Sequence, residues 1–189
     1  MRKKIISTII LCAISLITFA QLPSFLWKLE NGKLVNPNTY QFDVYLYNTG
    51  ETNFELRGGT IAFNVNSAWR NGGTIEVSTL TSELVSEQQK GGALYSSNSS
   101  DYLRKIINMV SKGAGTIITS KSKVNCFTIQ LTNSVVFSKK SNPKFSWKFD
   151  LPPGAGFNCS NAKNSASVTV VAIRGSKEVV ENQKNCLVP

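Results

Sequence analysis

Histidine is absent from the 189-residue sequence. This excludes Ser-His-Asp and Cys-His catalysis, His-ligated metals and the side chain most used for proton transfer near neutral pH. The 11 acidic residues are scattered rather than clustered, so no pair of carboxylates is placed for glycoside hydrolysis. The glycine pairs lack the strand-to-helix context of a phosphate-binding loop. We therefore expect a protein that is not an enzyme and that uses no cofactor.

Metal and nucleic-acid motifs are lacking too. The nearest calcium candidates, Asp43 with Glu51 and the run 99–101, have no recognisable ligand spacing, so we predict no metal site. Lysines and arginines cluster between 104 and 148 and could attract acidic polysaccharide, lipopolysaccharide or nucleic acid. Dispersed lysines beside strands more often protect sheet edges and keep an exported protein soluble. We expect no nucleic-acid partner.

The first 20 residues have the three-part layout of a secretory signal peptide. Arg2, Lys3 and Lys4 are followed by an apolar stretch over 5–19 and by the small residue Ala20. A membrane-spanning helix needs about 20 consecutive apolar residues, and this stretch is shorter and diluted by Ser and Thr. Cys12 lies in the middle of the stretch, which excludes a lipoprotein signal. We predict cleavage after Ala20 and a secreted product, extracellular, at the cell surface or periplasmic.

Removal of residues 1–20 changes the composition of the mature chain. They hold three of the 21 Lys and Arg and none of the 11 Asp and Glu, so the net charge falls from +10 to +7. The remaining length suits one domain with a single core. No later apolar run reaches spanning length, so we expect no integral membrane segment. The predicted organisation is a signal peptide (1–20), an N-terminal lead-in (21–37) and a β-sandwich domain (38–189).

Three cysteines remain after cleavage, none with zinc-site spacing. Cys159 lies in a turn-rich loop and Cys186 near the C-terminus, so we predict a Cys159–Cys186 disulfide. It would close a loop of under 30 residues and contribute on the order of 3–4 kcal/mol. Cys126 lies within a strand pattern, where a free cysteine usually packs as a small hydrophobic residue.

Most of the mature chain alternates apolar and polar residues with the period of half-buried strands. Turn signals such as Asn48–Thr49–Gly50 and Asn71–Gly72–Gly73 separate these segments. Residues 82–90 could form a short helix or a loop, and residues 102–110 could form a strand or a helical turn. Eight or more short strands predict an all-β fold, an antiparallel β-sandwich. The clearest strand-like segments are 39–47, 54–56, 60–65, 74–79, 125–131, 144–149 and 167–173, and 102–110 is a further candidate.

The strand and turn YLYNTG, the NGGTI turn, the run 113–117 and the segment CFTIQLTNSVVF at 126–137 resemble a known family. It is the cohesin-like β-sandwich module of secreted Bacteroidetes proteins that use the type IX export system. The resemblance covers about residues 38–173. It implies a jelly-roll-type fold with adhesive, scaffolding or carbohydrate-associated roles rather than catalysis.

Exposed aromatic side chains are the best candidates for recognition. In 39–47, Tyr45 and Tyr47 alternate with the apolar residues and so fall on the polar face of their strand. Trp69, in the turn 67–71, is the next candidate. Trp147 shares a strand face with Phe145 and is expected to be buried.

Two functions follow from these residues. We favour a structural or interaction module, adhesive or scaffolding, that contacts a surface or secreted protein partner. The alternative is a carbohydrate-binding module that holds polysaccharide on Tyr45, Tyr47 and Trp69.

Overall fold

The computed structural model describes residues 24–97, 101–148, 170–174 and 177–181. In these ranges two very short helices, α2 and α3, interrupt a chain that is otherwise strand and loop. No helix in these described ranges is long and apolar enough to cross a membrane. The elements are β1 (Phe25–Asn36), β2 (Thr39–Asn48), β3 (Phe54–Leu56), β4 (Gly59–Asn64), α2 (Ser67–Arg70), β5 (Ile75–Thr81), α3 (Ser86–Gln89), β6 (Ala93–Ser96), β7 (Tyr102–Ile107), β8 (Thr116–Ile118), β9 (Lys123–Asn133), β10 (Ser146–Trp147), β11 (Val170–Arg174) and β12 (Lys177–Glu181).

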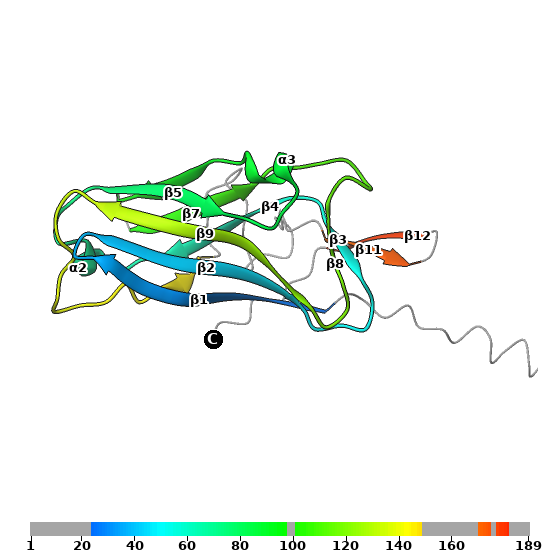
Figure 1. The fold of residues 1–189 in the computed structure, drawn as a ribbon, viewed down its shortest axis with the longest axis horizontal. Coiled ribbons are helices and arrows are strands. Elements are labelled where there is room, and N and C mark those ends of the chain that lie inside the picture. Colours follow the sequence, from blue (N-terminus) through cyan, green and yellow to red (C-terminus); the bar gives the residue numbers. More distant parts are fainter. Residues whose placement is uncertain (1–23, 98–100, 149–169, 175–176, 182–189) are drawn as a thin grey trace, which may run out of the picture.

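The strands of the described residues form three four-stranded sheets, and each of their pairs is antiparallel. The front sheet has the order β1-β2-β9-β5, the back sheet β10-β4-β7-β6 and the end sheet β12-β11-β3-β8. Figure 1 shows the front sheet as one layer, with β4 and β7 behind it and the end sheet at one end of the molecule. The predicted all-β antiparallel sandwich is confirmed.

The core lies between the front and back sheets, where the alternating apolar residues meet. Phe42, Val44 and Leu46 point inward from β2, and each is at most 2% exposed. Phe63 of β4 and Leu103 of β7 meet them from the back sheet and are fully buried. Burial of a side chain of this size contributes about 1.5–3 kcal/mol. The period-2 pattern of the sequence therefore becomes the packing that holds the two layers together.

Cys126 departs from the predicted alternation of its strand. The sequence placed it opposite Phe127, yet both side chains are fully buried. Val44 pairs with Phe127 while Tyr45 pairs with Asn125, so Cys126 is the extra residue of a β-bulge. The bulge turns both side chains into the core. Cys126 thus packs as a small hydrophobic residue, as expected. It reaches the core because the bulge shifts the register between β2 and β9.

Three further expectations can be compared with the structure. The segment 25–36, expected within a lead-in, is β1, and its Phe25 and Trp27 belong to the core. The sandwich therefore includes residues well before 38. The ambiguous segment 82–90 contains the short helix α3, and 102–110 contains the strand β7. Along β7 the residues alternate between half-buried and buried, so one face of the strand is buried, which is the pattern of a sheet rather than of a helix.

Candidate recognition surfaces on the front sheet

Strand alternation places Tyr45 and Tyr47 side by side on the outer face of the front sheet. Their ring centroids lie 6.2 Å apart at an interplanar angle of 59°. Lys123 of β9 pairs with Tyr47 across the sheet, and Lys28 of β1 pairs with Tyr45. Glu30 follows on β1. We call these five residues the tyrosine patch.

Hydrogen bonds and cation–π contacts join all members of the tyrosine patch. The Tyr47 hydroxyl donates to Glu30 Oε1 at 2.5 Å, and Lys123 Nζ donates to Glu30 Oε2 and to the Tyr47 oxygen, each at 3.1 Å. Lys123 Nζ also lies 3.9 Å from the centroid of the Tyr45 ring. Lys28 Nζ lies 4.7 Å from that of Tyr47. Each tyrosine ring therefore already has a cation over one face.

These contacts fix the charge states of the patch. The hydrogen bond from Tyr47 lowers the pKa of Glu30, and the same bond raises the pKa of Tyr47. Hydrogen bonds to Tyr47 and Glu30 raise the pKa of Lys123. At neutral pH the patch therefore holds an ionised Glu30, a protonated Lys123 and a neutral Tyr47.

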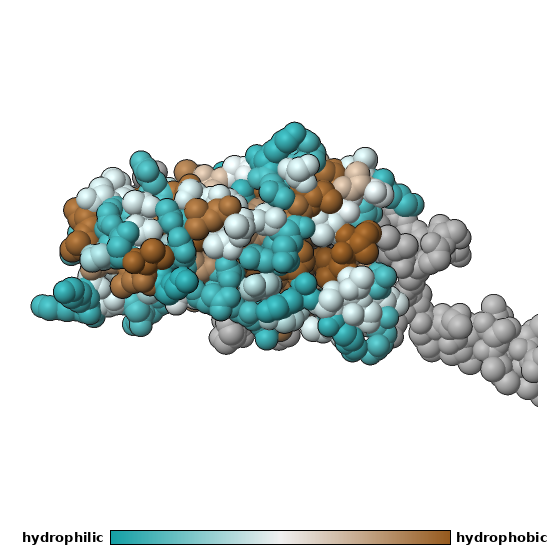
Figure 2. Space-filling model, viewed as in Figure 1, coloured by the Kyte–Doolittle hydropathy of each residue, from teal (hydrophilic) through white to brown (hydrophobic). Residues whose placement is uncertain are grey.

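The outer face continues from the patch as a row of polar side chains that bond to one another. Thr128 Oγ1 donates to Asp43 Oδ1, and Asn31 Nδ2 donates to Asp43 Oδ2, both at 2.6 Å. Gln41 Nε2 donates to Gln130 Oε1 at 2.8 Å. Figure 2 shows this view of the molecule as mainly hydrophilic, with separate apolar areas.

Trp69, the third predicted binding residue, is not exposed and does not join the patch. It lies in α2 with only 2% of its surface accessible. Its ring stacks on Phe137 at 3.8 Å and meets Tyr40 edge-on at 5.2 Å. The Ser138 amide donates to the Trp69 carbonyl oxygen, which holds the loop after β9 over the indole. A loop distant in sequence thus buries a residue that its own turn would leave exposed.

Cys159 and Cys186 lie outside the described residues, so their predicted disulfide stays a prediction. The calcium candidates Asp43 and Glu51 are occupied separately, since Glu51 pairs with Lys121 at 2.7 Å. Within the described part of the chain, no three His, Cys, Asp or Glu side chains gather as metal ligands.

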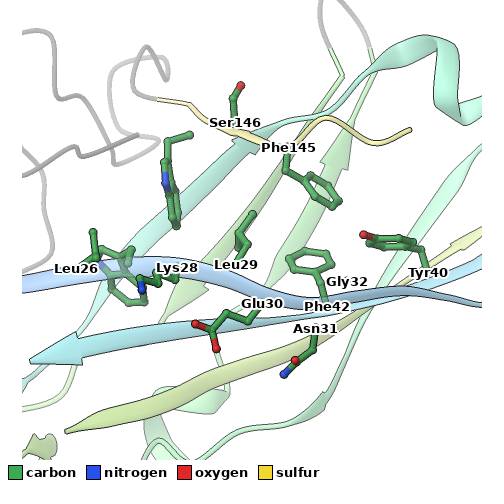
Figure 3. Close-up of a pocket in the computed structure, with 12 residues that line it drawn as sticks. Leu26, Lys28, Leu29, Glu30, Asn31, Gly32, Tyr40, Phe42, Phe145 and Ser146 are labelled. Carbon is green, nitrogen blue, oxygen red and sulfur yellow. The ribbon is translucent and has the colours of Figure 1, made fainter. Parts of the chain in front are cut away.

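A groove that the sequence did not indicate opens between β1 of the front sheet and β10 of the back sheet. Its volume is about 690 Å³. In Figure 3, Phe145 and Phe42 lie close together and Tyr40 stands beside them, while Glu30 and Asn31 point to the opposite side of the sheet. We call it the β1–β10 groove. Its lining residues are Leu26, Trp27, Lys28, Leu29, Glu30, Asn31, Gly32, Tyr40, Phe42, Phe145, Ser146 and Trp147.

No protein-family model matches the chain. No curated protein matches its sequence either. Among solved structures it is similar to one described as "The unique CBM3- of Hungateiclostridium clariflavum", at 15% identity and a TM-score of 0.44, over 84% of this chain and 97% of that one. The fold defines an antiparallel β-sandwich module.

Proposed function

We propose that this chain is an exported, non-catalytic recognition module that contacts a surface or secreted protein through the tyrosine patch. The carrying observation is that Lys123 and Lys28 cover ring faces of Tyr45 and Tyr47. A cation already lies over one face of each ring, so a sugar could stack only on the opposite face. A protein partner can instead use the tyrosine edges, the hydroxyl groups and the charged side chains together.

Composition supports the same proposal. Tyrosine is enriched at the energetic centres of protein interfaces, because it combines a large apolar ring with a hydrogen-bonding tip. The surrounding Lys28, Glu30 and Lys123 form the polar rim that such centres need. The predicted signal peptide and the resemblance to cohesin-like modules of type IX-exported proteins support an adhesive or scaffolding role outside the cytoplasm.

The test is capture of a cell-surface or secreted protein from the producing organism by the immobilised module. We expect Tyr47→Ala to reduce capture of that protein at least tenfold, and Thr132→Ala to leave it unchanged. Thr132 is the matched control because it lies on the same face of the front sheet but outside the patch. A glycan array run in parallel decides the alternative: saturable glycan binding that Tyr47→Ala abolishes would overturn protein recognition in favour of sugar binding at the patch.

A further inference from the structure

Four exposed aliphatic side chains gather at the end of the sandwich where β1 and β9 finish and where α2 lies (Figure 1). They are Leu34 and Val35 of β1 and Val135 and Val136 of the loop after β9, and each is 41–55% exposed. Figure 2 shows apolar side chains at this end, with hydrophilic ones projecting beside them. Single exposed aliphatic residues are ordinary, whereas a group of them marks a contact surface.

Hydrogen bonds between loops fix this arrangement. The Phe137 amide donates to the Pro37 carbonyl oxygen at 2.9 Å, which joins the loop after β9 to the turn between β1 and β2. Asn71 Nδ2 donates to the Val136 carbonyl oxygen at 3.2 Å and so ties the turn after α2 to the same loop. Phe137 itself is buried and stacks on Trp69. Because Phe137 occupies the inward position of the loop, its neighbour Val136 is left outside.

The charged side chains of these loops are all basic. Segments 33–38, 66–74 and 133–144 contain no Asp or Glu. The acidic residues nearest to them in sequence are Glu30, which bonds within the tyrosine patch, and Glu76 of β5. The ion pairs among the described residues use none of the lysines of these loops. We call the four aliphatic residues together with these lysines the basic end. The lysines are all exposed: Lys33, Lys139, Lys140 and Lys144.

We propose that the basic end docks on the surface of an anionic lipid bilayer. Its aliphatic side chains enter the boundary between headgroups and acyl chains, and its lysines extend past them to the lipid phosphates. Each lysine held close to an anionic leaflet strengthens binding about fivefold. The tyrosine patch lies on the outer face of the front sheet and stays accessible in this arrangement. The proposal does not depend on the function proposed for the patch.

The composition of the basic end favours a lipid surface over a protein partner. Protein interfaces are enriched in aromatic residues and arginine and depleted of lysine. Here Trp69 and Phe137 are buried, and the guanidinium group of Arg70 is bound to Asp101 at 2.8 Å. Aliphatic side chains and lysines are what this end exposes. A nucleic acid would use the lysines but would leave the aliphatic side chains in water.

Flotation of the purified protein with lipid vesicles tests the proposal. One set of vesicles contains phosphatidylcholine and phosphatidylglycerol, and the other contains phosphatidylcholine alone. We expect binding to the anionic vesicles that weakens as the salt concentration rises, and no binding to the neutral ones. Lys139→Gln combined with Lys140→Gln should weaken binding at least tenfold. Val136→Ser should weaken it about fivefold, because it removes apolar surface from the contact.

Matched controls make the same kinds of change elsewhere. Lys90→Gln combined with Lys121→Gln removes two exposed lysines that lie after α3 and between β8 and β9. Leu94→Ser removes an exposed aliphatic side chain from β6. Neither these changes nor Tyr47→Ala should alter vesicle binding. The proposal is overturned by absence of vesicle binding, by equal binding to neutral vesicles, or by equal losses in the control and basic-end variants. Loss of protein capture in Val136→Ser without vesicle binding would assign this end to a protein interface instead.

Discussion

The tyrosine patch and the β1–β10 groove use opposite faces of the same two strands, β1 and β2. On the outer face, the described polar contacts satisfy the hydroxyl of Tyr47 and the charges of Glu30 and Lys123. On the inner face, Trp27 Nε1 is buried and has no hydrogen-bond partner among the described residues. The tyrosines on the outer face therefore have polar or charged partners, whereas Trp27 on the inner face has no hydrogen-bond partner among the described residues. Exposure of an aromatic residue does not measure its availability to a ligand.

The strongest way to sharpen this comparison is a matched pair of truncations on β2. Phe42, at 2% exposure, forms the floor of the groove and part of the core. We expect Phe42→Ala to lower the free energy of unfolding by about 3–5 kcal/mol, because it leaves a cavity. Tyr45→Ala on the outer face should cost less than about 1 kcal/mol. Urea denaturation measures both; similar losses would mean that the two faces are not packed as described.

Lys105 is a buried charged residue whose ammonium group has few polar contacts. It is 3% exposed, its Nζ donates to the Gly91 carbonyl oxygen at 2.5 Å and lies 4.5 Å from the Phe127 ring centroid. Burial lowers its pKa from the ordinary 10.5. We expect Lys105→Met to raise the free energy of unfolding by about 1–2 kcal/mol at neutral pH, since it removes the desolvation of a charge.

The pH dependence checks this cause. A lysine with a lowered pKa in the folded state binds its proton more weakly there than in the unfolded chain. Its contribution to stability therefore rises as the pH increases from the folded-state pKa towards 10.5. The advantage of Lys105→Met over the wild type should shrink across that window in denaturation series at increasing pH. An advantage that stays constant would assign the effect to packing instead.

The sequence was informative where a property depends on the neighbours along one strand. Period 2 alone separates Tyr45 and Tyr47 from the core residues of β2, and the structure has them on the outer face. Cys126 broke the same rule because a bulge depends on the partner strand. The burial of Trp69 was not predicted, because the loop that covers it lies more than sixty residues later in the chain. Local pattern cannot report either effect.

The groove could not be predicted, because it depends on the order of strands in two sheets. Trp27 lay in a segment expected to precede the domain, and Trp147 was expected to be buried. The groove forms only because β1 and β10 are the edge strands on the same side of the sandwich. No spacing in the sequence encodes that neighbourhood. The one available sign was the number of aromatic residues on inward faces.

A substitution at Gly32 should change the groove while leaving the patch intact. A Cβ there would overlap the Tyr40 hydroxyl, which is the far end of a side chain that can rotate. We expect Gly32→Ala to cost less than about 1 kcal/mol of stability and to move the Tyr40 ring signals in NMR spectra. Signals of Tyr45 and Tyr47 should stay in place. Shifts of equal size at Tyr47 would show that the two surfaces are coupled through β1.

The smallest expected effect isolates the hydrogen bond at the centre of the patch. That bond from Tyr47 to Glu30 raises the pKa of Tyr47, because loss of the phenol proton would place two negative charges together. Glu30→Gln should therefore lower the pKa of Tyr47 towards the ordinary 10.0, measured by NMR titration of the ring. The control is the titration of Tyr47 in the Thr132→Ala variant, where the pKa should stay as in the wild type. The lowered pKa of Glu30 gives the matching sign in acid: its contribution is present above the ordinary 4.5 and is lost as the pH falls through the folded-state value, so the bonds that Glu30 accepts from Tyr47 and Lys123 should then weaken. If Glu30→Gln leaves the pKa of Tyr47 unchanged, the hydrogen bond to Glu30 does not hold Tyr47 as described. The contrast between the tyrosine patch and the groove would then be wrong.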